Sequence, residues 1–254
     1  MPNTRQAAAQ QATPLPGIPA TGILLVLNDV NPCAEQEFNL WYQEQHLPER
    51  LSVPGFSSGR RYRALSDGRR YMALYECETI EVLSSAAYAQ RLAHPTAWTT
   101  KMMPHFRNML RSACRETWSL GHGIGGVATV TFLKPVQGKA DEARRFVSSV
   151  LGPECKNSGS LVRMALWEAD AGYSGGATAE TTLRGQPDDA ADWVLFAESI
   201  DAGRTSEVLA ETLQEHCGQA AQILETGDSL DYRLLCQVNG WNAACHHPPE
   251  SRRP

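Results

Sequence analysis

The sequence predicts an α+β protein in which a unit of strand, helix, strand, strand, helix and strand occurs twice. Apolar and turn-forming stretches give this order over residues 22–120 and give it again over residues 124–238. A repeat of about a hundred residues is too long for a solenoid and fits two fused copies of one small domain. Residues 23–27 are all isoleucine, leucine or valine, so this strand must be covered on both faces of its sheet.

The elements of the first unit follow from side-chain spacing and turn residues. After the strand at 23–27 and a break at 28–32, a helix carries large side chains at helical spacing, namely Phe38, Trp41, Tyr42 and Gln45. Pro48 is expected to end or kink this helix. The remaining expected elements are a strand at 59–64, a turn at 66–68, a return strand at 70–77, helices near 80–92 and 96–110, and a strand at 114–120.

The second unit follows a glycine-rich linker at 121–126. Its expected elements are strands at 127–132, 161–167, 193–199 and 232–238, and helices at 139–152 and 203–218. This order is the ferredoxin-like one, whose helices cover one face of the sheet, so we expect the two sheets to pack face to face. Units at 21–120 and 121–240 are expected between flexible tails at 1–20 and 241–254.

Composition excludes several classes of function. The chain is 42% hydrophobic and 20% charged, with a net charge of −5 and no basic stripe, which argues against nucleic acid as a partner. No apolar run approaches the roughly 20 residues that span a bilayer, so no membrane partner is expected. Seven scattered cysteines without a CxxC pair indicate a reducing cytoplasm. Residues 245–247, Cys-His-His, lack a spaced partner pair, so no metal site is expected.

One segment resembles a known superfamily. Residues 38–50 (FNLWYQEQHLPER), followed by Val53-Pro54-Gly55-Phe56 and Arg60-Arg61-Tyr62, are similar to the dimeric α+β barrel superfamily, and most to its EthD-like branch and related uncharacterised bacterial proteins. The resemblance covers about residues 20–120, whereas the second half matches only in element order. Members with one domain per chain form the barrel as dimers. The resemblance therefore implies an intrachain barrel, in a monomer or in a further homodimer.

The resemblance also limits the types of reaction and the cofactors to be expected. The superfamily includes isomerases, cyclases, decarboxylases and monooxygenases that work without metals, and also haem enzymes. Haem-binding relatives hold the group through a histidine of the C-terminal half. His216, near the end of the last helix, is the only histidine of the second unit beyond the linker at 121–126, so no haem is expected.

His46 is the first candidate for catalysis. It follows Tyr42 by one helical turn, so the two side chains can meet. A histidine whose pKa lies near 7 can act as general base or acid. The structural alternative is that His46 only orders the turn that leads to Pro54.

Tyrosines of the two central strands are the next candidates. Tyr62 and Tyr75 are expected as catalytic groups and Tyr71 as a binding group, because phenol hydroxyls can polarise a carbonyl oxygen. Ordinary aromatic packing is the alternative. Arg61 can clamp a substrate carboxylate. The other expected substrate-binding residues are Trp41, Tyr42, Trp98 and His105. The last two are a lid of the site or simple loop packing.

These observations predict a cofactor-independent enzyme for a small molecule. The expected activity is that of an isomerase, a cyclase or a decarboxylase-type lyase, acting by general acid–base chemistry on a partly apolar substrate with a carbonyl or carboxylate. One alternative is a haem- or oxygen-dependent oxidoreductase on the same fold, and another is a non-catalytic small-molecule-binding protein. No P-loop, GxGxxG, GxSxG or HExxH motif is present, so no nucleotide cofactor is expected.

Overall fold

In the computed structural model, which describes residues 21–174 and 178–240, eight antiparallel strands close into one barrel. The order around the barrel is β1-β3-β2-β8-β5-β7-β6-β4. The strands are β1 (Gly22–Val30), β2 (Phe56–Ala64), β3 (Tyr71–Cys77), β4 (Phe106–Gly121), β5 (Val127–Pro135), β6 (Leu161–Ala169), β7 (Trp193–Ser199) and β8 (Leu224–Asn239). The tails predicted at 1–20 and 241–254, with the Cys-His-His run, lie outside the described residues.

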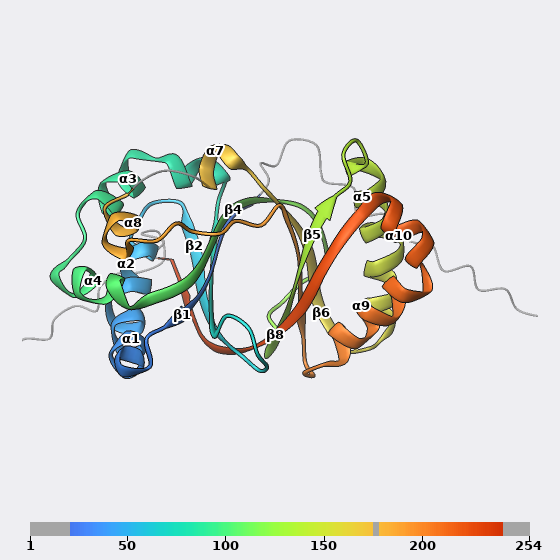
Figure 1. The fold of residues 1–254 in the computed structure, drawn as a ribbon, viewed down its shortest axis with the longest axis horizontal. Coiled ribbons are helices and arrows are strands. Elements are labelled where there is room, and N and C mark those ends of the chain that lie inside the picture. Colours follow the sequence, from blue (N-terminus) through green and yellow to red (C-terminus); the bar gives the residue numbers. More distant parts are fainter. Residues whose placement is uncertain (1–20, 175–177, 241–254) are drawn as a thin grey trace, which may run out of the picture.

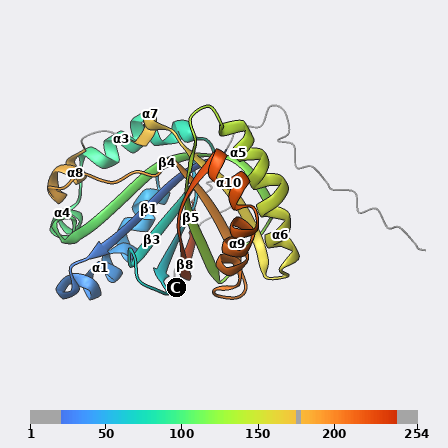
Figure 2. The same ribbon diagram turned by 45° about the vertical axis from the view of Figure 1, so that its right-hand side comes forward.

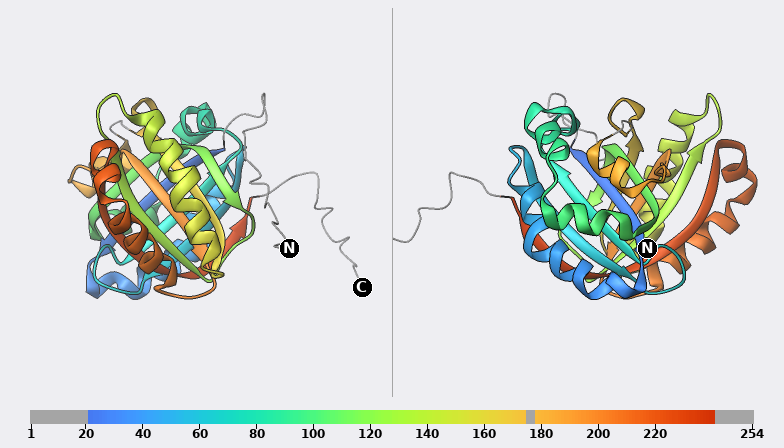
Figure 3. Two further views of the ribbon diagram at one scale, coloured as in Figure 1. Left: turned by 90° about the vertical axis from the view of Figure 1, so that its right-hand side faces the viewer. Right: turned by 60° about the vertical axis from the view of Figure 1, so that its left-hand side comes forward.

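The helices lie outside the barrel, in two groups with the strands between them (Figure 1). They are α1 (Glu35–Trp41), α2 (Leu47–Leu51), α3 (Ala86–Ala93), α4 (Ala97–Met102), α5 (Ala140–Phe146), α6 (Gly152–Asn157), α7 (Ala171–Ser174), α8 (Ala179–Arg184), α9 (Arg204–Glu215) and α10 (Cys217–Ile223). Short 3₁₀ turns span Pro32–Ala34, Ile80–Ser84 and Met103–His105. In Figures 2 and 3 helices α1–α4 lie across the outer face of the first-half strands, together with α7 and α8, and helices α5, α6, α9 and α10 lie across the outer face of the second-half strands.

The first strand is buried on both faces, as its sequence predicts. Leu24 and Val26 of β1 face the helices of the first half, whereas Ile23, Leu25 and Leu27 face the barrel interior. The interior is packed with side chains from both halves, including stacked rings of Trp167 and Phe196 at 4.4 Å. The barrel is therefore a filled core rather than a channel.

The expectation of two separate sheets packed face to face was wrong in one respect. The sheets join at both edges, because the two longest strands each pair with both halves. Strand β4 pairs with β1 through its first part and with β6 through its last part, and β8 pairs in the same way with β5 and β2. Both strands begin about eight residues earlier than predicted, because pairing supplies hydrogen bonds that the polar segments 106–113 and 224–231 do not signal. The helix expected at 96–110 shortens accordingly to α4.

Buried charges tie the two halves together inside the barrel. Arg60 of β2 donates to Glu198 of β7 at 2.8 Å and also pairs with Glu76 of β3. The hydroxyl of Tyr62 donates to the same Glu198 at 3.0 Å. Arg163 of β6 bonds Glu76 at 3.3 Å, which extends the network across the seam. Burial raises the pKa of Glu198, while Arg60 and the Tyr62 hydroxyl oppose this rise.

Pro48 does not end the first helix. Its ring excludes a regular α-helical bond to the carbonyl one turn earlier, and the chain accommodates this with a π-helical turn at Tyr42–His46. The amide of Leu47 donates to the carbonyl of Tyr42 five residues back, and α2 then continues to Leu51. The second half has the same feature, a π-helical turn at Val147–Leu151 ahead of Pro153.

Within the described ranges, no helix combines the length and the apolar character that crossing a membrane requires.

Candidate functional site

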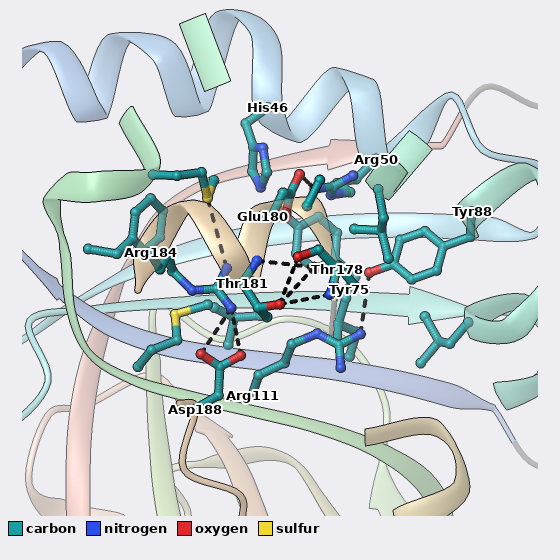
Figure 4. Close-up of a pocket in the computed structure, with 18 of the residues that line it drawn as sticks. His46, Arg50, Tyr75, Tyr88, Arg111, Thr178, Glu180, Thr181, Arg184 and Asp188 are labelled. Atoms are coloured by element: carbon teal, nitrogen blue, oxygen red, sulfur yellow. Dashed lines mark hydrogen bonds and ion pairs between the residues drawn. The ribbon is translucent and has the colours of Figure 1, made fainter. Parts of the chain in front are cut away.

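A cavity of about 380 Å³ lies between the outer face of the first-half strands and the helices that cover them. This volume is at the lower end of the range for small-molecule sites, roughly 300–1,000 Å³. Apolar walls come from Leu24, Val26, Leu83, Leu92, Met103, Phe106 and Met109. The polar lining residues include His46, Arg50, Tyr75, Tyr88, Arg111, Glu180 and Arg184 (Figure 4).

The π-helical turn brings His46 into an aromatic cluster. Its ring lies 4.8 Å from that of Tyr42, the contact that helical spacing predicts. The wider turn adds a contact with Trp41 five positions back, with ring centroids 4.3 Å apart. Figure 4 shows the imidazole projecting from its helix toward Glu180. The insertion that accommodates Pro48 therefore also aims His46 into the cavity.

His46 is a neutral imidazole at physiological pH. Burial holds its pKa well below the usual value, and the positive charges of Arg50, Arg61 and Arg184 lower this pKa further. The Nδ1 atom is buried and has no hydrogen-bond partner among the described residues. A neutral, unpartnered imidazole can accept a proton from a bound molecule or donate a hydrogen bond to it.

Two tyrosines extend the polar wall beside His46. The hydroxyl of Tyr75 donates to that of Tyr42 at 3.2 Å, and both residues line the cavity. Burial raises the pKa of both phenols, so both stay protonated. The Tyr42 proton has no acceptor among the described residues, so this hydroxyl can donate to an oxygen of a ligand.

The second half of the chain completes the cavity. The segment after β6 crosses to the first half, where α7 contacts β4 and the 3₁₀ turn Ile80–Ser84 and α8 contacts α3 (Figure 1). A capping box of Thr178 and Thr181 starts α8. Glu180 of α8 then forms a buried ion pair with Arg50 of α2. Nη2 of Arg184 donates to both carboxylate oxygens of Asp188, at 2.9 and 2.7 Å.

Residues that line the cavity carry buried nitrogen atoms without a hydrogen-bond partner among the described residues. Besides His46 Nδ1, they are Nη1 of Arg50 and Nε of Arg184, both buried and unpartnered among the described residues. Leaving a buried donor without an acceptor costs roughly 1–3 kcal/mol.

The structure brings together only some of the residues predicted for the site. His46, Tyr42 and Tyr75 line the cavity. The Trp41 ring packs against that of His46 at an angle of 33°, and its indole N–H donates to Thr99 at 3.4 Å. Tyr62 is not in the cavity, because strand alternation turns it into the barrel interior toward Glu198.

The other predicted binding residues lie outside the cavity. Arg61 stacks over the Tyr42 ring at 4.3 Å and donates to Asn39, so it acts on the cavity only through its charge. Tyr71 donates to Glu35 at 2.6 Å. Trp98 donates to Glu37 at 3.1 Å and is not among the residues that line the cavity. His105 is half-buried and lies in the 3₁₀ turn before β4, outside the lining residues.

Sequence reasoning missed the charged residues of the site. Arg50 follows His46 by four positions, a spacing that places it on the same helix face and could have revealed it. Tyr88 and Arg111 lie on elements whose bounds differ from the predicted ones. Glu180 and Arg184 lie between the strands expected at 161–167 and 193–199, where no helix was expected and the sequence carries no signal of a contact with the first half.

The residues present do not fit a haem. His216 caps the end of α9, where its ring packs edge-on against Phe146 at 6.0 Å, away from the cavity. A ligating histidine almost always donates its other ring N–H to an acceptor, and Nδ1 of His46 has no such partner among the described residues. Within those residues, no group of three His, Cys, Asp or Glu side chains could hold a metal ion.

Comparison with known proteins identifies the fold. An anthrone oxidase-like protein matches with a TM-score of 0.58 and 13% identity, over 88% of this chain and 94% of that one. A monooxygenase-like protein of Fusobacterium nucleatum matches with a TM-score of 0.55 and 10% identity, over 87% and 95%. A mutant chlorite dismutase of Candidatus Nitrospira defluvii matches with 0.54 and 13%, over 86% and 92%. No family model and no curated protein sequence matches.

These structures share the dimeric α+β barrel fold. This chain has the same fold. The predicted barrel architecture is therefore confirmed. The predicted function is wrong: the matched structures are oxidase-like, monooxygenase-like and chlorite dismutase proteins, which favours the oxidoreductase alternative over a cofactor-independent isomerase, cyclase or decarboxylase.

Proposed function

We propose that this protein is an oxygen-dependent oxidoreductase that acts on a small aromatic molecule in the cavity. The observation that carries the proposal is the neutral imidazole of His46, aimed into a cavity whose lining combines apolar walls with the guanidinium groups of Arg50 and Arg184. The anthrone oxidase-like and monooxygenase-like neighbours support oxidation as the reaction type.

The cavity walls suit a flat, largely apolar substrate. Leu24 and Val26 present branched side chains from the strand floor, and Phe106 adds a ring. Burial of an aromatic body against such walls supplies binding energy at about 25 cal/mol per Å² of apolar surface removed from water. The Tyr42 hydroxyl can donate to a substrate carbonyl and so make the neighbouring C–H groups more acidic.

His46 is the base in this proposal. It accepts a proton from the activated carbon or the phenol of the substrate. The cations that disfavour an imidazolium in the empty site, Arg50 and Arg184, stabilise the substrate anion that forms at the same moment. Proton transfer therefore exchanges an unfavourable isolated charge for an ion pair.

The substrate anion then reduces molecular oxygen. For an anthrone-like methylene group the balance is R₂CH₂ + O₂ → R₂C=O + H₂O. The anion forms a C–O bond to oxygen and takes back the proton of His46, which gives a hydroperoxide. Loss of the remaining C–H proton with cleavage of the O–O bond gives the carbonyl and water. The carbon loses four electrons, which the oxygen molecule accepts.

Oxygen uptake with anthrone as the probe tests the role of His46. The wild-type protein should consume oxygen faster than the spontaneous rate, and His46→Gln should lower the enzymatic rate by about 10²–10⁴, the usual contribution of a general base. His94→Gln is the matched control, because His94 is exposed and bonds only the Gln90 carbonyl. Equal rates for wild type and His46→Gln would remove His46 from the mechanism.

We also infer that the chain is a tandem fusion of two ferredoxin-like units. Element order supports this, as does the strand order 4-1-3-2, which recurs as 8-5-7-6. The paired π-helical turns ahead of Pro48 and Pro153 support it further. The inference that the chain belongs to the EthD-like branch rests on the motif at 38–50. A cytoplasmic location fits six described cysteines, all free thiols.

A further inference from the structure

Arg111 is the one cavity-lining arginine without a carboxylate partner among the described residues. It lies on β4 between Met109 and Ala113, on the face that carries the cavity floor. Its guanidinium donates to the Ser174 carbonyl at 3.3 Å and to the Tyr88 hydroxyl at 3.5 Å. Both contacts are long, and together they use two of five N–H donors.

The charges that line the cavity do not cancel. Three guanidinium groups line it, those of Arg50, Arg111 and Arg184. Two carboxylates oppose them, because Glu180 pairs with Arg50 and Asp188 pairs with Arg184. With His46 neutral, the lining carries one excess positive charge, and Arg111 is its source. A partly desolvated guanidinium without a counter-ion favours an anionic ligand.

We propose that the substrate carries one carboxylate, which Arg111 binds through paired N–H donors. This inference rests on the proposed function, since it names the substrate class of the same site. Arg111 matches a carboxylate in geometry, because the fork of a guanidinium meets both oxygens at once. Tyr88 adds a second contact: its hydroxyl accepts from Arg111 and has no acceptor for its own proton among the described residues.

The positions of Arg111 and His46 on opposite walls of the cavity indicate how the substrate is oriented. Arg111 projects from the strand floor, whereas His46 projects from the helices that cover it (Figure 4). A carboxylate held at Arg111 directs the remainder of the molecule along the apolar walls toward His46. The inferred substrate is therefore an aromatic acid whose reactive hydroxyl or methylene group lies away from its carboxylate.

A matched pair of probes tests the charge preference by calorimetric titration. The pair is 2-naphthoate and 2-naphthamide, which share size and shape and differ in charge. The wild-type protein should bind 2-naphthoate about 10- to 100-fold more tightly, the factor that charge-assisted hydrogen bonds provide. Arg111→Met should abolish this preference and leave the affinity for 2-naphthamide within about twofold. Equal affinities in the wild type would overturn the inference.

Two further variants keep the test decisive. Arg107→Met is the matched control on the same strand, because Arg107 is exposed and donates only to main-chain carbonyls. It should retain the full preference. Arg111→Lys keeps the charge and loses the fork, so it should bind 2-naphthoate with intermediate affinity if Arg111→Met fails to fold. An Arg111→Met or Arg111→Lys variant with the wild-type preference would refute the carboxylate site.

This binding test is independent of turnover. Carboxylate preference without any oxygen uptake would remove the proposed reaction and leave the Arg111 site standing. Oxygen uptake with neutral anthrone, together with equal binding of the two naphthalene probes, would support the reaction and refute the carboxylate site.

Discussion

Substitution of Glu180 by alanine should destabilise the protein through a residue that lies far from Glu180 in the sequence. Glu180 belongs to α8, and its carboxylate pairs with Arg50 of α2, whose side chain is only 4% exposed. The change leaves the Arg50 charge buried without its counter-ion. Removing one partner of a buried ion pair typically costs about 3–5 kcal/mol.

The lower end of that range applies here. The six-residue helix α8 can detach and admit water to Arg50, which limits the cost to the free energy that holds α8 in place. A loss of about 3 kcal/mol corresponds to a fall in Tm of about 6–12 °C, at roughly 2–4 °C per kcal/mol for a chain of this size. Thermal unfolding followed by circular dichroism measures the shift.

Two matched variants separate the buried pair from a general effect of charge. Glu207→Ala removes a carboxylate that pairs with Arg204 at 3.8 Å on the exposed face of α9, and should change the free energy of unfolding by less than about 0.5 kcal/mol. The double variant Arg50→Met with Glu180→Leu removes both charges and should recover most of the lost stability. A Tm of Glu180→Ala within about 1 °C of wild type, roughly the precision of a melt, would refute the reasoning.

Two other predictions concern Tyr62 and His46. Tyr62→Phe removes the hydrogen bond to Glu198 and should lower the free energy of unfolding, measured by urea denaturation, by about 1–3 kcal/mol. Oxygen uptake per folded molecule should stay unchanged. A large loss of specific activity would show that Tyr62 belongs to the functional site after all. His46 has a folded-state pKa below its unfolded value near 6.5, so its share of stability is complete above that value and decreases as pH falls below it, by up to about 1.4 kcal/mol per pH unit. His46→Gln should therefore flatten the loss of stability between pH 7 and pH 5.5 in urea titrations at each pH, and an unchanged slope would contradict a buried neutral imidazole.

Much of the fold could be predicted because its signals are local. The apolar run at 23–27 and the order of strands and helices are enough to indicate two units and a barrel. The lengths of β4 and β8 could not be predicted, because their polar halves become strands only through pairing with β1 and β5. Closure of the barrel is a property of these contacts between distant segments.

The site residues likewise fall into those that local sequence spacing could predict and those that only contacts between distant segments bring together. Tyr42 and His46 are neighbours along one helix, so spacing alone placed them together. Tyr62 was misassigned because alternation along a strand does not say which face of the sheet bears the cavity. Glu180 could not be found at all, since its contact with Arg50 joins segments 130 positions apart.

The stoichiometry of oxygen consumption tests the central claim most directly. With anthrone as probe, the account predicts one molecule of oxygen consumed for each molecule of anthraquinone formed, no reaction without oxygen, and loss of both signals in His46→Gln. Conversion of the probe under anaerobic conditions, or the same oxygen uptake in wild type and His46→Gln, would contradict the assignment of this cavity to an oxygen-dependent oxidation.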